Sequence, residues 1–186
     1  SSAVGLVQLK KFPAEMQEID TAMNYFWDNL EGTPGFIAHR PQKGSGLTKG
    51  AWYSPLAHYR PEELGGLSVT RFCEALNAEG YFCGQGCNKA LHLHPIFNTI
   101  DVYGDGKPTR NAFSSHDLTQ PAGSLPVAES IQSRVISIAW FRKFYPSIID
   151  QHVEAVKKVV AQHAELLKDD PGNPPGSGNW RLSFRR

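Results

Sequence analysis

The sequence has 186 residues, of which 40% are hydrophobic and 20% are charged, and its formal net charge is +1 at pH 7. This length fits one domain with a buried core, and the composition is that of an ordinary globular protein. A net charge so close to zero gives no reason to expect nucleic acid or an anionic membrane surface as a partner.

Neither a membrane span nor a secretory signal is visible in the chain. No apolar run approaches the length of a transmembrane helix, and the N-terminus lacks a basic segment followed by an apolar one. The cysteines number three, which is odd. We therefore expect free thiols in a cytoplasmic protein.

The first segment, residues 3–30, is predicted to be a helix because its apolar residues recur three and four positions apart. This stripe consists of Leu9, Phe12, Met16, Ile19, Met23, Phe26 and Leu30. Pro13 is expected to kink or restart the helix, because proline removes one backbone hydrogen bond. The chain begins inside this apolar, helix-forming segment, which suggests that another segment precedes it in a parent protein.

Residues 36–48 are predicted to be a loop, and residues 51–59 a strand. Because Pro55 cannot donate to a sheet ladder, this strand should be an edge or bulged one. A helix then follows from Pro61 to Gly80, since proline favours the first turn of a helix and glycine its end.

The second half of the chain begins with a long irregular segment, residues 98–124. A short helix is predicted from Pro126, a second strand over residues 134–140, and a last long helix from Pro146. The tail shows no periodicity, and three apolar residues could dock it: Trp180, Leu182 and Phe184.

These elements predict an α/β (α+β) sandwich, a small and mostly antiparallel sheet covered by the two long helices. The chain is interpreted as one domain, residues 1–186, with a leading helix over 1–31 and an irregular tail over 168–186.

The stretch from Gly80 to Phe97 carries the candidate site residues: Asn88, His92 and His94. Because Pro95 disfavours helical geometry in the residue before it, the His-Leu-His triplet is predicted to be extended, with both imidazoles on one face. The alternative is a glycine-rich loop with two surface histidines.

A metal-binding module is a second interpretation of the same stretch, since Cys83, Cys87, His92 and His94 are all possible zinc ligands. Their spacing, C-x3-C-x4-H-x-H, resembles no common zinc motif. We therefore predict no metal site.

Four segments resemble the DegT/DnrJ/EryC1/StrS family of pyridoxal-phosphate-dependent aminotransferases. They are SSAVGLVQLKK, LSVTRFCEALNAEGYFCGQG, ALHLHPIF and LPVAESIQSRVISIAWF, and they occur in the family's order over nearly the whole chain. The resemblance implies the carboxy-terminal small domain of a fold-type-I aminotransferase that acts on a keto-sugar or cyclitol.

The same resemblance implies that the N-terminal domain, which binds pyridoxal phosphate and supplies the Schiff-base lysine, is missing from this chain. We therefore expect no catalysis and no bound cofactor in this piece alone. The resemblance also implies that the full-length parent is a homodimer, in which His92, Asn88 and His94 would line the cleft for substrate and cofactor. A stand-alone ligand-binding module without enzymatic activity is the alternative.

Overall fold

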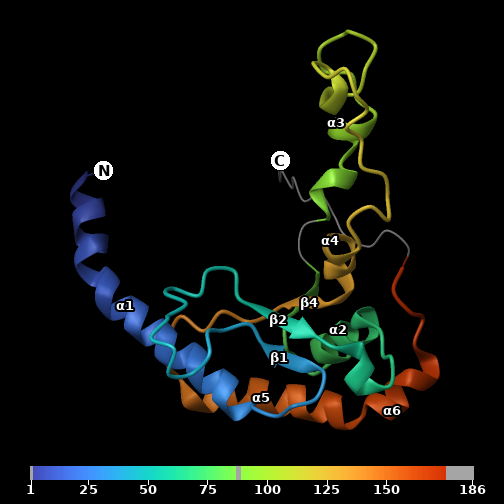
Figure 1. Ribbon diagram of the computed structural model, residues 1–186. Helices are drawn as coiled ribbons and strands as arrows, with labels where there is room; N and C mark the ends of the chain where they lie inside the picture. Colours follow the sequence, from blue (N-terminus) through green and yellow to red (C-terminus); the bar gives the residue numbers. More distant parts are fainter. Residues whose placement is uncertain (1, 87–88, 175–186) are drawn as a thin grey trace.

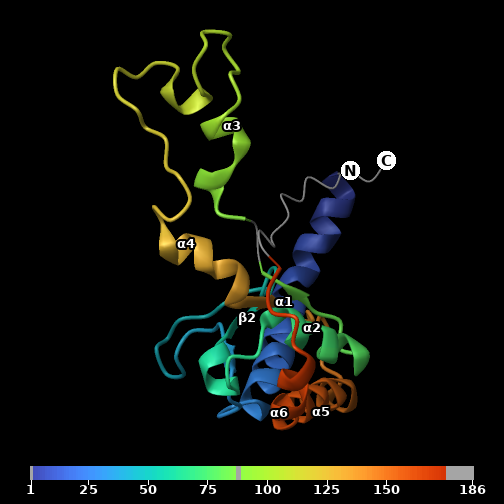
Figure 2. The same ribbon diagram turned by 90° about the vertical axis from the view of Figure 1, so that its right-hand side faces the viewer.

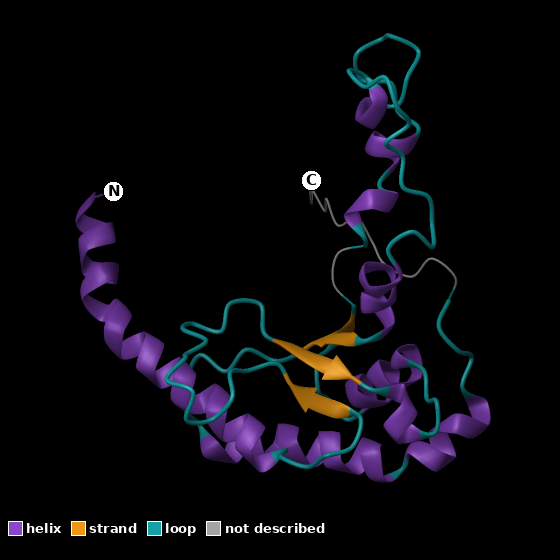
Figure 3. Cartoon of the chain, in the orientation of Figure 1, coloured by secondary structure: helices purple, strands orange, loops and turns teal. Residues whose placement is uncertain are grey.

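The computed structural model describes residues 2–86 and 89–174. It is a small antiparallel sheet with long helices on one face, as the sequence predicted (Figure 3). Helix α1 (Ser2–Asn29) and helix α5 (Pro146–Ala161) run along this face, and helix α2 (Val69–Ala78) packs beside them (Figure 1).

Helix α1 is continuous through Pro13, and only its second half belongs to the core. Ile19, Met23 and Phe26 are buried, whereas Leu9 and Phe12 of the same apolar stripe are 68% and 52% exposed. Figure 1 shows the reason: the N-terminal half curves away from the body and meets no other element. Periodicity predicted the helix correctly but could not show where its packing partners end.

The sheet has the order β1-β2-β4-β3, with all neighbours antiparallel. Its strands are short: β1 (Phe36–Ala38), β2 (Leu56–Tyr59), β3 (Gly84–Gln85) and β4 (Val135–Ser137). In the register, Phe36 lies opposite Tyr59 and Ala57 opposite Ile136. All four side chains are buried, because this face of the sheet lies against the helices.

Two expectations about the sheet are wrong. Residues 36–38 form an edge strand rather than part of a loop. The strand near Pro55 is an inner strand, not an edge one, because it begins only at Leu56. Pro55 has no N–H to donate, but its carbonyl accepts a hydrogen bond from the Ile138 N–H at 3.1 Å. The missing donor therefore removes no hydrogen bond from the sheet.

The predicted helix from Pro61 to Gly80 is two elements, a 3-10 turn (Pro61–Leu64) and α2. Gly65 and Gly66, both with positive φ, separate them. Ser68 then begins α2 as its N-cap, since its side chain accepts a hydrogen bond from the Arg71 N–H.

The C-terminal part continues from α5 into a short helix, α6 (His163–Leu166), and a 3-10 turn (Leu167–Asp169). Asp170 ties this end to the start of α2, because its carboxylate accepts hydrogen bonds from both the N–H and the hydroxyl of Ser68. The predicted docking of Trp180, Leu182 and Phe184 concerns positions outside the described residues.

The core is rich in aromatic side chains, among them Phe26, Trp27, Tyr59, Phe72 and Tyr81. Two of the cysteines, Cys73 and Cys83, are buried free thiols; Cys87 lies outside the described residues. The helices of the described ranges include no stretch that is both long and apolar enough to cross a bilayer.

Candidate functional site at the base of a projecting arm

A projecting arm, residues 89–125, leaves the sheet after β3 and returns through helix α4 (Pro126–Ser130) and a 3-10 turn (Ile131–Ser133). Figure 2 shows it standing clear of the helices and the sheet. Its own elements are small: a 3-10 turn (Leu91–Leu93), helix α3 (Pro95–Asn98) and a further turn (Thr109–Asn111). The arm contains the irregular segment predicted over 98–124.

The His-Leu-His triplet at the base of the arm is not extended, contrary to the prediction. Leu91–Leu93 form a 3-10 turn, and only His94 has the β-region backbone that Pro95 demands. Pro95 restricts only the backbone of His94, so His92 and Leu93 remain able to form a turn. The two imidazoles therefore do not lie on one face of a strand.

His92 is 5% exposed, and its Nε2 lies 2.9 Å from the Oε1 of Glu129 on α4. Its carbonyl accepts a hydrogen bond from the side-chain amide of Asn98. His92 thus joins three parts of the chain: the outgoing base of the arm, α3 and the returning helix α4.

Glu129 is the centre of this junction. Besides His92, it accepts hydrogen bonds from the N–H of Gly123 at 2.7 Å and the N–H of Leu125 at 3.0 Å. These two backbone donors, and then His92, hold the pKa of the Glu129 carboxyl below its usual range. A charged carboxylate therefore fixes both ends of the arm to each other.

His94 is half-buried and caps α3, because its Nδ1 accepts a hydrogen bond from the Ile96 N–H at 3.1 Å. Its ring meets the ring of Phe97 edge-on at 6.3 Å. Asn88, the third predicted site residue, lies outside the described residues. The structure thus brings His92 and His94 to the arm's base and leaves Asn88 undescribed.

Two residues at this base were missed by sequence reasoning. Glu129 could have been noticed as an acid in the first turn of a helix that starts with proline. Asn98 carries a buried Oδ1 with no hydrogen-bond partner among the described residues. Leaving such an acceptor unpaired costs about 1–3 kcal/mol, so this atom is suited to a donor from outside the described chain.

The metal interpretation finds no support in the described residues. They hold no group of three or more His, Cys, Asp or Glu side chains placed to bind an ion. Cys83 instead donates weakly to the Cys73 carbonyl, and Cys87 lies outside the described residues.

Comparisons with known proteins identify the fold. No protein-family model matches the chain, and no curated protein matches it. Among solved structures, the aminotransferase from Psychrobacter cryohalolentis matches 88% of this chain with a TM-score of 0.62 and 19% identity. The putative sugar aminotransferase Spr1654 from Streptococcus pneumoniae, in its PMP form, matches 86% with a TM-score of 0.54 and 15% identity.

The chain spans 38% and 34% of the lengths of these two proteins. It therefore has the fold of about a third of an aminotransferase chain, as the resemblance in the sequence predicted.

Four lysines of the described chain, at 43, 143, 158 and 168, are held in ion pairs with carboxylates and are not free to form a Schiff base. Lys49 lines a hollow of about 120 Å³, too small for pyridoxal phosphate, since pockets for ligands of drug size begin at roughly 300 Å³.

Proposed function

We propose that the chain is the C-terminal small domain of a DegT/DnrJ/EryC1/StrS-type aminotransferase that transfers an amino group to a keto-sugar or cyclitol. The observation that carries this proposal is the fold match over 88% of the chain, joined to four sequence segments in the family's order. An upstream domain would bind the pyridoxal phosphate.

The exposed half of α1 supports the existence of that upstream domain. Apolar side chains cover it without packing against the body: Val4, Leu6, Val7, Leu9 and Phe12. Contiguous apolar surface of this kind marks an interface in soluble proteins. We infer that the upstream domain covers this half-helix in the parent enzyme.

The projecting arm supports a second subunit as partner. Several large apolar side chains on it are exposed, including Val102, Tyr103 and Phe113. The arm is nevertheless internally held, since Arg110 bonds Gln120 and Asn111 bonds Asp117. Because the arm is ordered and its apolar side chains are uncovered, it is suited to contact another chain. We propose that this chain is a second copy, in a homodimer.

We propose that His92, His94 and Asn88 border the substrate cleft of the parent enzyme. The low exposure of His92 and its bond to Glu129 favour a positioning role, in which it holds the arm's base in place.

The test begins with the open reading frame upstream of this segment in the source gene. The full-length protein should carry a lysine-bound pyridoxal phosphate, visible in its absorption spectrum, and should transfer an amino group from an amino donor to a keto-sugar or cyclitol. Residues 1–186 alone should do neither. An upstream frame without a cofactor domain would contradict the proposal.

The role of His92 is tested in that full-length enzyme. The His92→Ala variant should lower kcat while leaving the cofactor spectrum unchanged, and Glu129→Gln should lower it in the same direction. His116→Ala, an exposed histidine on the arm, is the matched control. Unchanged kinetics in the His92 variant would remove this residue from the site.

A further inference from the structure

A second cluster of reactive side chains lies on the body of the protein, apart from the arm. His39 follows β1 and His58 lies on β2, and their rings meet edge-on with centroids 4.9 Å apart. The Nζ of Lys49 lies 3.0 Å from the Nδ1 of His39 and also donates to the His39 carbonyl.

The loop that carries Lys49 is held in a strained conformation. Trp52 and Ser54 are non-glycine residues with positive φ, 54° and 50°. Trp52 is nevertheless buried, and its Nε1–H donates to the Asp20 carboxylate at 2.8 Å. Its ring also lies beside the Lys49 amine, 5.4 Å from centroid to Nζ. Backbone strain that is held in place by packing is frequent at functional sites.

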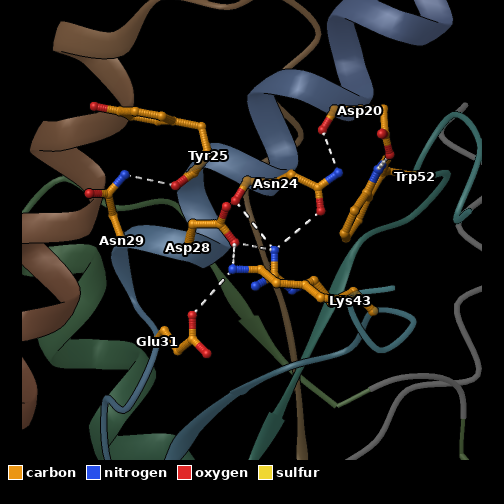
Figure 4. A network of polar contacts seen from close by, with 9 residues as sticks. Asp20, Asn24, Tyr25, Asp28, Asn29, Glu31, Lys43 and Trp52 are labelled. Atoms are coloured by element: carbon orange, nitrogen blue, oxygen red, sulfur yellow. Dashed lines mark hydrogen bonds and ion pairs between the residues drawn. The ribbon is translucent and has the colours of Figure 1, made fainter. Parts of the chain in front are cut away.

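Lys43, six residues away, shows how unusual this environment is. The Nζ of Lys43 pairs with Asp28 at 3.0 Å and Glu31 at 3.3 Å (Figure 4), and these carboxylates raise its pKa. Lys49 has no carboxylate within ion-pair distance among residues 2–86 and 89–174, and burial lowers its pKa. One loop therefore holds one lysine fixed in its charged form and one shifted towards the neutral amine.

We propose that Lys49 is a nucleophilic amine that condenses reversibly with small aldehydes or ketones, with His39 as its neighbouring proton acceptor. A neutral amine has two N–H bonds, and the two acceptors on His39 occupy both. Its lone pair is then available to attack. Partial desolvation beside other basic groups is a recognised way to activate a lysine.

The reaction balances without a redox partner. The Lys49 lone pair attacks the carbonyl carbon and forms a C–N bond as the C=O π bond breaks. One amine hydrogen passes to the resulting alkoxide oxygen and makes the hydroxyl of a carbinolamine. His39 accepts the second hydrogen through Nδ1 and returns it to that hydroxyl, the C–O bond breaks, water leaves and an imine remains. The hollow of about 120 Å³ beside Lys49 admits only small carbonyl compounds.

The experiment labels residues 1–186 with limiting propionaldehyde and cyanoborohydride at pH 7, and peptide mass mapping then measures the rate at each lysine. Lys49 should be propylated about threefold faster or more than Lys143 and Lys158, since each unit by which an amine pKa falls raises its neutral fraction about tenfold. The two comparators are paired with Glu18 and Glu79. Equal or slower labelling of Lys49 would overturn the proposal.

Variants separate this chemistry from simple exposure. His39→Ala should reduce the Lys49 rate to that of the comparators, and His58→Gln should leave it unchanged, because His58 makes no hydrogen bond to Lys49 in the described structure. Circular dichroism checks that each variant is folded. In urea, the preference for Lys49 should vanish. A preference that persists in urea, or that survives His39→Ala, would contradict the assigned environment.

Discussion

Glu129 and His92 close the base of the projecting arm: they are 37 positions apart in sequence, and 2.9 Å separates the Oε1 of Glu129 from the Nε2 of His92. The same carboxylate accepts from the Gly123 and Leu125 backbone. One side chain thus links the outgoing and returning segments, and the order of the arm should depend on it.

The first prediction is that Glu129→Ala loosens the arm without unfolding the body. Trypsin should cleave after Arg110 several-fold faster, because local opening becomes easier when the junction is lost. Limited proteolysis with mass analysis measures this. Glu165→Ala, which removes an exposed acid paired with Lys168, is the control. Equal cleavage rates in both variants would show that Glu129 does not hold the arm.

The second prediction concerns pH. The folded-state pKa of Glu129 is lowered, chiefly by the Gly123 and Leu125 N–H donors, so its contribution to arm stability is fully present above the ordinary glutamate pKa of about 4.3. It is lost as the pH falls through the lowered value. The NMR shift of the Gly123 amide should therefore titrate with a midpoint below about 4.3. In Glu129→Gln this titration should disappear, and a midpoint above that value would contradict the assigned bonds.

The third prediction concerns the start of α2. Ser68→Ala removes the N-cap bond to the Arg71 N–H and the hydroxyl bond to Asp170, so the free energy of unfolding should fall by about 1–2 kcal/mol. Urea denaturation measures it. Ser147→Ala, at an exposed position in the first turn of α5, should change stability by less than about 0.5 kcal/mol. Similar losses in both variants would rule out the cap as the cause.

The fourth prediction compares two phenylalanines on the same helix. Phe26 is fully buried and Phe12 is 52% exposed. In residues 1–186, Phe26→Ala should cost about 3–5 kcal/mol, whereas Phe12→Ala should cost about 0.5 kcal/mol or less. Thermal or urea unfolding distinguishes them. A large loss from Phe12→Ala would mean that the N-terminal half of α1 is packed in solution.

The long helices were predictable because their apolar stripes extend over several turns, and Ile149, Val153 and Val156 line α5 as expected. Strand β1 was not predictable, because three residues are too few to show alternation and its pairing with β2 depends on the tertiary structure. The predicted extended triplet failed because Pro95 constrains His94 alone.

The candidate site was predictable only in part. His92 and His94 stood out as imidazoles beside a proline, but Glu129 is separated from them by the whole arm, and no local pattern joins such distant residues. The environment of Lys49 was not predictable either, since the burial of its amine depends on His39 and Trp52. Contacts of this kind become visible only when the fold is known.

The last prediction concerns the uncovered half of α1. Leu9 and Phe12 lie on one side of a helix that projects from the body, and their exposed apolar area is what a partner would bury (Figure 1). Without the upstream domain, the exposed half of α1 can bury its apolar side chains only against a second copy of the chain. Residues 1–186 should therefore self-associate in a concentration-dependent manner. The double variant Leu9→Glu and Phe12→Glu should be monomeric, because buried unpaired carboxylates would oppose association.

Sedimentation velocity over a wide range of protein concentration measures this association. Val127→Glu, which charges a more exposed apolar position on α4, should leave it unchanged. At a concentration low enough for all three proteins to be monomeric, their unfolding midpoints should agree, since none of these side chains belongs to the core. If the wild-type chain stays monomeric at its highest soluble concentration, or if the α4 variant abolishes association instead, then the exposed half of α1 is not the associating surface.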